Sequence, residues 1–297
     1  MKKINVGTYS LGGGFGAPPV PLLDTLKQAA AMGYTGIEFL ERDLRNNSVE
    51  DIKAWCAEAG IEPVGVHCEP DAIPEIVPIM AAVGGKMVVT PQMAFYDKET
   101  AIAFAQKLNA YGKEAKEKYG IKVGYHNHSN EFWVDDGKYL EDYIIENTDP
   151  EYVGIQLDAG WCANAGVDPV EYVKKNLGRF ISIHVKENNK ANGPEKPEPR
   201  TGRPPMPAMK MGPDGKPIMD EEAKKRMAEM FARMNERMSN QCPMGDPTSN
   251  INWKALKELT DSQNNDCAWT VEREYDYKNG DKAACVAEDA AWLLANL

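Results

Sequence analysis

Short apolar runs of β type alternate with amphipathic helical stretches along nearly the whole chain, and no other feature restricts its fold as strongly. Such alternation is typical of parallel strands joined by crossover helices. Eight rounds are expected, with strands at residues 4–11, 36–40, 63–68, 87–91, 122–128, 153–160, 180–187 and 269–275. The helices that follow are expected at residues 21–32, 48–59, 74–83, 99–119, 138–147, 169–176, 252–262 and 281–296. The pattern predicts an α/β chain of the (β/α)8 TIM-barrel class, with residues 1–297 in a single domain.

Helix start and stop signals support these boundaries. Ser48 with Asp51 three residues later is typical of a helix start, and Gly60 and Gly120 stand where helices should end. Eight βα units can also form an open, doubly wound sheet. The glycine-rich segment 12–16 lacks the glycine spacing that such sheets use to bind phosphates, which favours the barrel.

One segment interrupts the alternation. Residues 188–250, after the seventh expected strand, are rich in Pro, Gly, Met, Lys and Glu, with a helical stretch expected at about 220–238. Loops that follow barrel strands emerge on the face where active sites lie. This insertion is therefore expected to be a lid over the site or a surface for a second subunit, with a solvated insertion of no role as the alternative.

Composition narrows the class of function. The formal net charge of −11 disfavours nucleic acid as a partner. No run of about 18 apolar residues occurs, which predicts a soluble chain without a membrane segment. The six cysteines form no CxxC pair and no regular spacing, as expected for reduced thiols in the cytoplasm.

All four histidines fall at or near the carboxyl ends of expected strands, at positions 67, 126, 128 and 184. Each one alone could be a core residue. Carboxylates accompany them at the same ends, because strand alternation places Asp158 on the face of Gln156, and pairs Glu272 with Glu274. Four histidines beside carboxylates favour a catalytic site.

Asp158, His184 and Glu272 are expected to converge at one rim, with Glu131 reaching over from the loop after the fifth strand. Three carboxylates and one imidazole suit a divalent metal ion, with Mn²⁺ preferred and Mg²⁺ or Co²⁺ as alternatives. An ion of this kind acidifies the C–H group beside a carbonyl that it binds. His128 or a glutamate at the ion, Glu131 or Glu272, would then remove the proton.

Other residues are expected to contact the substrate. Lys186 is a candidate for stabilising the negative charge that develops in the reaction, although it could instead neutralise neighbouring carboxylates. Residues expected to bind substrate around the rim are Glu38, His67, His126, Trp161 and Glu274. His126 could alternatively orient a metal ligand, and Trp161 could be a core residue rather than a wall for a sugar ring.

Four strings together resemble the sugar phosphate isomerase/epimerase superfamily with its xylose isomerase-like barrel. They are YHNHSNEF at 125–132, QLDAGW at 156–161, SIHVKE at 182–187 and TVE at 270–272. The resemblance implies a Glu, Asp, His, Glu metal set, carried here onto Glu131, Asp158, His184 and Glu272. The YHNHxxEF string is similar to the branch with C-glycoside deglycosidase catalytic subunits and 3-keto-glycoside lyases, where His128 would be the base. This branch implies a carbohydrate substrate and either a homo-oligomer or a complex with a smaller subunit.

Two reactions fit these residues. An isomerase or epimerase would move a proton on a sugar through an enediolate. A lyase would remove the same proton and expel a leaving group from the β carbon of a 3-keto-glycoside or C-glycoside. A DNA-cutting hydrolase on a related barrel would need more metal ligands than four histidines offer, and the intact ligand set argues against a non-catalytic subunit.

Overall fold

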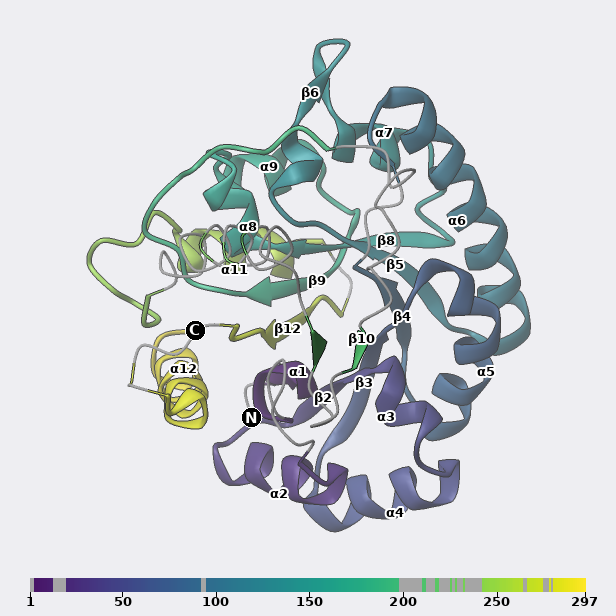
Figure 1. Cartoon of the computed structure of the whole chain (residues 1–297), viewed down its shortest axis with the longest axis vertical. Coiled ribbons are helices and arrows are strands. Elements are labelled where there is room, and N and C mark those ends of the chain that lie inside the picture. Colours follow the sequence, from purple (N-terminus) through teal and green to yellow (C-terminus); the bar gives the residue numbers. More distant parts are fainter. Residues whose placement is uncertain are drawn as a thin grey trace.

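The computed structural model confirms the barrel (Figure 1). It describes residues 3–12, 20–91, 95–197, 210–211, 217–218, 242–263, 266–274 and 280–297, with the single residues 225, 228, 232 and 278. Eight strands close in the order β1-β12-β9-β8-β5-β4-β3-β2, and every neighbouring pair is parallel. The strands are β1 (Asn5–Gly7), β2 (Gly36–Leu40), β3 (Glu62–His67), β4 (Met87–Thr90), β5 (Lys122–His126), β8 (Val153–Asp158), β9 (Phe180–Val185) and β12 (Ala268–Val271).

Helices surround the strands on the outside (Figure 1). The longer ones are α2 (Leu22–Ala31), α4 (Val49–Ala59), α5 (Ile73–Val83), α6 (Lys98–Tyr119), α7 (Leu140–Glu146), α9 (Pro169–Lys175), α11 (Trp253–Asp261) and α12 (Lys282–Asn296). Their apolar faces pack against the outer strand residues and form one continuous buried core. Several begin as expected: Ser48 accepts a hydrogen bond from the Asp51 N–H at 3.0 Å, and Gly60 ends α4 with φ of 70°.

The expected strands at 4–11 and 153–160 were too long at their carboxyl ends, because the short helices α1 (Thr8–Leu11) and α8 (Ala159–Asn164) begin there. A third short helix, α3 (Glu41–Arg45), follows β2, whose bounds match the strand expected at 36–40. α8 begins at once after β8 because the Asp158 side chain accepts the Trp161 N–H at 2.7 Å and caps the helix. In β9 and β12 the ladder ends at Val185 and Val271, so Lys186 and Glu272 lie just beyond it.

Most of the insertion at 188–250 lies outside the described residues, including nearly all of the helix expected at 220–238. Within it β10 (Lys210–Met211) pairs antiparallel with β11 (Pro217–Ile218). A second small hairpin, β6 (Val134–Asp135) with β7 (Lys138–Tyr139), follows β5. A role for the insertion as lid or subunit surface stays a prediction. Among the described helices, none has the length and apolar character that a membrane span requires.

Candidate metal centre and active site

Four side chains from four barrel strands converge at the carboxyl ends of the strands. His126 ends β5, Asp158 ends β8, His184 lies near the end of β9, and Glu272 follows β12. One donor atom from each lies within 4.8 Å of the others, and the first three side chains are buried. Four ligands arranged as a tetrahedron around an ion at about 2.1 Å lie about 3.4 Å from one another, so shifts of up to about an ångström would bring these donors into one coordination sphere.

The metal set expected from the sequence is therefore gathered in part. Asp158, His184 and Glu272 come together as predicted, but His126 and not Glu131 is the fourth member of the group. The Glu131 carboxylate is fully buried, where it accepts the Tyr125 hydroxyl at 2.6 Å and the His128 N–H at 2.9 Å. These two bonds, one to each carboxylate oxygen, anchor the turn after β5.

Gln156 determines which nitrogen of His126 carries the proton. The Gln156 amide nitrogen donates to Glu38 at 2.6 Å and to the Ser182 hydroxyl at 3.1 Å, which fixes the orientation of the amide. Its oxygen must then accept hydrogen bonds, from His126 Nδ1 at 3.1 Å and from His67 Nε2 at 2.6 Å. Nε2 of His126 is left with a free lone pair, as a metal ligand requires.

Two carboxylates contact the two ring nitrogens of His184. His184 Nε2 lies 2.7 Å from Glu38 Oε1, and Nδ1 lies 3.1 Å from Glu272 Oε2. Burial disfavours the imidazolium, but Glu38 and Glu272 outweigh burial and raise the pKa of His184 to about 10. A metal ion bound to His184 Nδ1 would replace the proton that this nitrogen shares with Glu272. Glu38 would orient the ring through Nε2.

Lys186 gives the carboxylates a positive neighbour. Its ammonium group lies 3.0 Å from Asp158, 2.9 Å from Glu272 and 3.1 Å from Glu274. It also lies 4.9 Å from the centre of the Trp161 ring, a cation–π distance. Burial raises the pKa of Asp158 to about 6, against the lowering effect of Lys186. The three carboxylates outnumber the single ammonium ion, and carboxylates are groups that can ligate a further cation.

Glu38 and His67 lie deeper than the rim positions expected for substrate contacts. Both are buried, 3% and 8% exposed, and their polar atoms face Gln156, His184 and each other at 3.2 Å. Burial also lowers the pKa of His67. His128 is only half-buried, its ring centre lies 5.1 Å from that of His126 and 5.8 Å from Trp161, and no hydrogen bond to its ring nitrogens occurs among the described residues. His128 is thus the histidine most open to a reactant.

A family model described as xylose isomerase-like TIM barrel matches residues 26–296. The chain belongs to this family. The resemblance read from the four strings is thereby confirmed at the level of the superfamily.

Other comparisons with family members agree. The chain is 27% identical over 197 residues to an inosose dehydratase of Mesomycoplasma hyopneumoniae strain 7448, a match that covers 56% of this chain and only 62% of that protein. A sugar phosphate isomerase/epimerase structure from Parabacteroides distasonis has a TM-score of 0.70 at 18% identity, with 99% of this chain and 98% of that chain covered. The IOLI protein, solved with a zinc atom, has a TM-score of 0.64 at 13% identity, with 99% and 97% covered. At these identities the two structures support the fold alone.

From the sequence, Gln156 has no assigned role and only shares a face with Asp158, and Glu38 is expected among the substrate contacts at the rim. Neither type of residue signals a positioning role by itself. The signal that the sequence offered was strand alternation. Gln156 stands two residues before the candidate ligand Asp158 in the same strand, so both side chains point to the same face.

Proposed function

We propose that this chain is a divalent-metal-dependent enzyme that removes a proton beside the carbonyl of a sugar or sugar-like ketone. The observation that carries the proposal is the convergence of His126, Asp158, His184 and Glu272 at the carboxyl end of the barrel. Active sites of TIM barrels lie at this end.

The donor set suits a catalytic divalent ion, which those four side chains would hold. Two imidazoles and two carboxylates are softer than three carboxylates and one imidazole, which favours Mn²⁺, Co²⁺ or Zn²⁺ over Mg²⁺. When bound, the ion would supply Lewis acidity toward a carbonyl oxygen of the substrate. Glu38 and Gln156 would keep the two imidazoles oriented.

Three residues would handle the substrate. His128 is assigned as the base, because its ring is only half-buried and no residue that the structure describes hydrogen-bonds its ring nitrogens. The Lys186 ammonium, held by Asp158, Glu272 and Glu274, would stabilise negative charge developing on a substrate oxygen. Trp161, against both His128 and Lys186, would cover the apolar face of a sugar ring.

The fate of the substrate anion distinguishes two activities. An isomerase returns the proton to a different carbon, and an epimerase returns it to the other face of the same carbon. One of these two activities is the first assignment. Loss of a group from the β carbon makes a lyase, and the likeness to an inosose dehydratase favours this second candidate. In a lyase, His128 would carry the proton that it removed from the α carbon and could give it to the leaving group.

The test is incubation of Mn²⁺-loaded protein in D₂O with an inosose, a keto-hexose or a 3-keto-glucoside. Deuterium in the recovered substrate or its isomer, detected by NMR, identifies an epimerase or isomerase. Loss of water or of the aglycone identifies a lyase. Asp158→Asn and His184→Gln should abolish either reaction, whereas Lys190→Met, an exposed change in the loop after β9, should retain it. A metal-loaded protein that exchanges no proton in any of the three ketones contradicts the proposal.

A further inference from the structure

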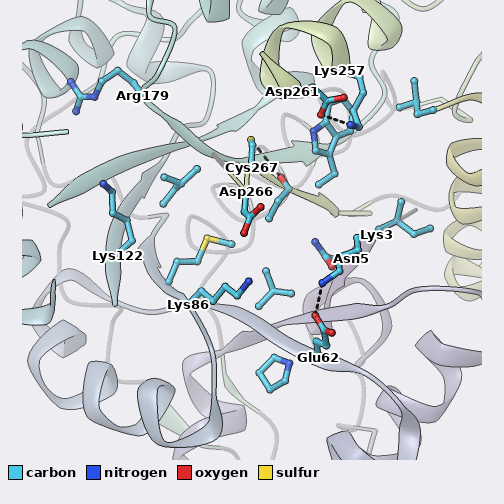
Figure 2. Close-up of a pocket in the computed structure, with 18 of the residues that line it drawn as sticks. Lys3, Asn5, Glu62, Lys86, Lys122, Arg179, Lys257, Asp261, Asp266 and Cys267 are labelled. Atoms are coloured by element: carbon cyan, nitrogen blue, oxygen red, sulfur yellow. Dashed lines mark hydrogen bonds and ion pairs between the residues drawn. The ribbon is translucent and has the colours of Figure 1, made fainter. Parts of the chain in front are cut away.

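A second cavity, drawn in Figure 2, is lined by residues at the amino ends of barrel strands, the end opposite to the metal centre. It has a volume of about 710 Å³, and its walls come from the amino ends of six strands, β1, β3, β4, β5, β9 and β12. Cavities of roughly 300–1,000 Å³ are typical of small-molecule sites. Amino-end faces of TIM barrels usually serve stability, so a cavity of this size there calls for an explanation.

The floor of the cavity is apolar. Val64, Met87, Ile181 and Trp269 line it, together with Pro63. The inner wall of the barrel is thin at this level, because the neighbouring strand positions are glycines into whose space Met87 and Ile181 extend; a Cβ on Gly65 would lie 2.9 Å from Met87, and one on Gly154 would lie 2.4 Å from Ile181. The floor therefore offers a hydrophobic surface to the body of a ligand.

One side of the cavity is cationic. Lys86, Lys116, Lys122 and Arg179 line it, and Figure 2 shows Lys86 extending toward the middle of the pocket. Of the three lining carboxylates, Glu62 pairs with Lys3 at 3.1 Å and Asp261 pairs with Lys257. Figure 2 shows the third, Asp266, near the middle of the pocket. In a chain with a formal net charge of −11, four cations along one wall stand out against the surrounding charge.

Two of the four cations have structural partners. Lys122 donates to the backbone oxygens of Pro150 and Glu151, and Arg179 donates to Ile145 O and to the Thr148 hydroxyl at 2.6 Å. Burial, Lys116 and Arg179 lower the pKa of Lys122, while Asp149 and Glu151 raise it. The cations at this wall are therefore close enough to repel one another, although two of them have structural partners.

Lys86 and Lys116 have no such partners. Neither side chain forms an ion pair or hydrogen bond with another residue in the part of the chain that the structure describes. Both ammonium groups therefore remain available at the edge of an apolar cavity, and no contact within the described fold accounts for them.

We propose that this cavity is a second ligand site, which binds a small organic anion with an apolar body. The anionic head would lie against Lys86 and Lys116, and the body would pack on Val64, Met87 and Ile181. The site is independent of the metal centre, because it shares none of the four ligand residues and opens at the other end of the barrel.

The test uses three probes of one shape and different charge: 1-naphthoate, 1-naphthamide and 1-naphthylmethylammonium. Isothermal titration calorimetry of the chelator-treated protein should show naphthoate binding at least tenfold more tightly than the amide, with no measurable binding of the ammonium. The preference for naphthoate should weaken as salt is added, because the charges are exposed at the rim. Equal affinity for the three probes overturns the proposal.

Variants locate the site. Lys86→Met with Lys116→Met should reduce naphthoate affinity at least tenfold and remove its advantage over the amide. Lys113→Met is the matched control, since this exposed lysine lies on the same helix, α6, and does not line the cavity; its affinity should be unchanged. Both lysines are exposed, so the double variant should fold, and circular dichroism checks this. Undiminished naphthoate binding by a folded double variant refutes the assignment.

Discussion

At the residue scale, the cluster depends on side chains that would not touch the ion. Gln156 is fully buried, accepts hydrogen bonds from two histidines and donates one to Glu38. One amide therefore orients three neighbouring side chains. Partners of this kind are typically worth 10–100-fold in metal affinity. If Gln156 orients the imidazoles, its replacement should weaken metal binding. If it only fills space in the core, metal affinity should not change.

Gln156→Leu is expected to lower the affinity for Mn²⁺ by about 10–100-fold, because His126 loses the acceptor that holds its Nδ1 proton. Titration of the folded variant with Mn²⁺, followed by calorimetry, measures the change. Gln106→Leu is the control, since it makes the same change on the exposed face of α6, and its affinity should stay within about threefold. Wild-type affinity in folded Gln156→Leu would rule out the orienting role.

Glu141 shows the cost of an isolated buried acid. It is fully buried in α7, and neither carboxyl oxygen has a hydrogen-bond partner among the described residues. Burial first, and then Glu131 and Asp142, raise the pKa of Glu141 well above its usual value, although Arg179 lowers it. The native chain therefore keeps a proton that the unfolded chain loses. Stability is fully present below the unfolded pKa and falls as pH rises through the native pKa.

Glu141→Gln should remove this pH dependence. The free energy of unfolding should rise at about pH 8 by about 1.4 kcal/mol for each unit by which the native pKa exceeds the unfolded one, with little change near pH 4. Urea unfolding at the two pH values measures the difference. Glu146→Gln, on the exposed end of the same helix, should change stability by less than about 0.5 kcal/mol at either pH. Equal effects of Glu141→Gln at both pH values would contradict the reasoning.

At the element scale, the position of α6 depends on a missing side chain. Gly112 lies in the middle of this helix, and a Cβ there would lie 2.7 Å from the Tyr152 carbonyl oxygen. The obstruction is backbone, which cannot rotate away. The glycine thus lets α6 approach the segment that leads into β8, the strand that ends at Asp158.

Gly112→Ala is expected to destabilise the chain, although alanine alone favours a helix by up to about 1 kcal/mol. Overpacking costs about 1–3 kcal/mol and should outweigh that gain. Denaturant unfolding should therefore show a net loss. Lys113→Ala, the exposed next residue, should stay within about 0.5 kcal/mol of the parent. A more stable Gly112→Ala would show that α6 can move away.

At the scale of the whole molecule, one ion would link four strands. His126, Asp158, His184 and Glu272 come from β5, β8, β9 and the end of β12, which are consecutive around the barrel. A ligand that binds only the folded chain stabilises it by mass action. Metal binding should therefore raise the free energy of unfolding, which can be measured without an assay of any reaction.

Removal of bound metal with a chelator should lower the free energy of unfolding, and Mn²⁺ at about 100 times its Kd should restore about 2.7 kcal/mol. Thermal or urea unfolding with and without added Mn²⁺ measures the effect. Asp158→Asn should lose most of the response. If the ion stabilises that variant as much as the parent, it binds elsewhere.

The sequence by itself determined the architecture and the position of the chemistry. Alternation of β-like and helical runs is a local pattern, and it predicted eight parallel strands in a barrel. Strand parity also brought Asp158, His184 and Glu272 to one end. These inferences need only the backbone period and the rule that active sites occupy the carboxyl ends of barrel strands.

Only the tertiary structure shows which side chains lie within 4.8 Å of one another at this end of the barrel. Glu131 and His126 are five residues apart, and spacing could not show that the Glu131 carboxylate accepts hydrogen bonds from Tyr125 and from the His128 N–H. Glu38 and Gln156 meet only because β2 and β8 face each other across the closed barrel. The cationic cavity likewise joins residues from six strands. Contacts across a barrel depend on closure and register, and no local sequence pattern records either of them.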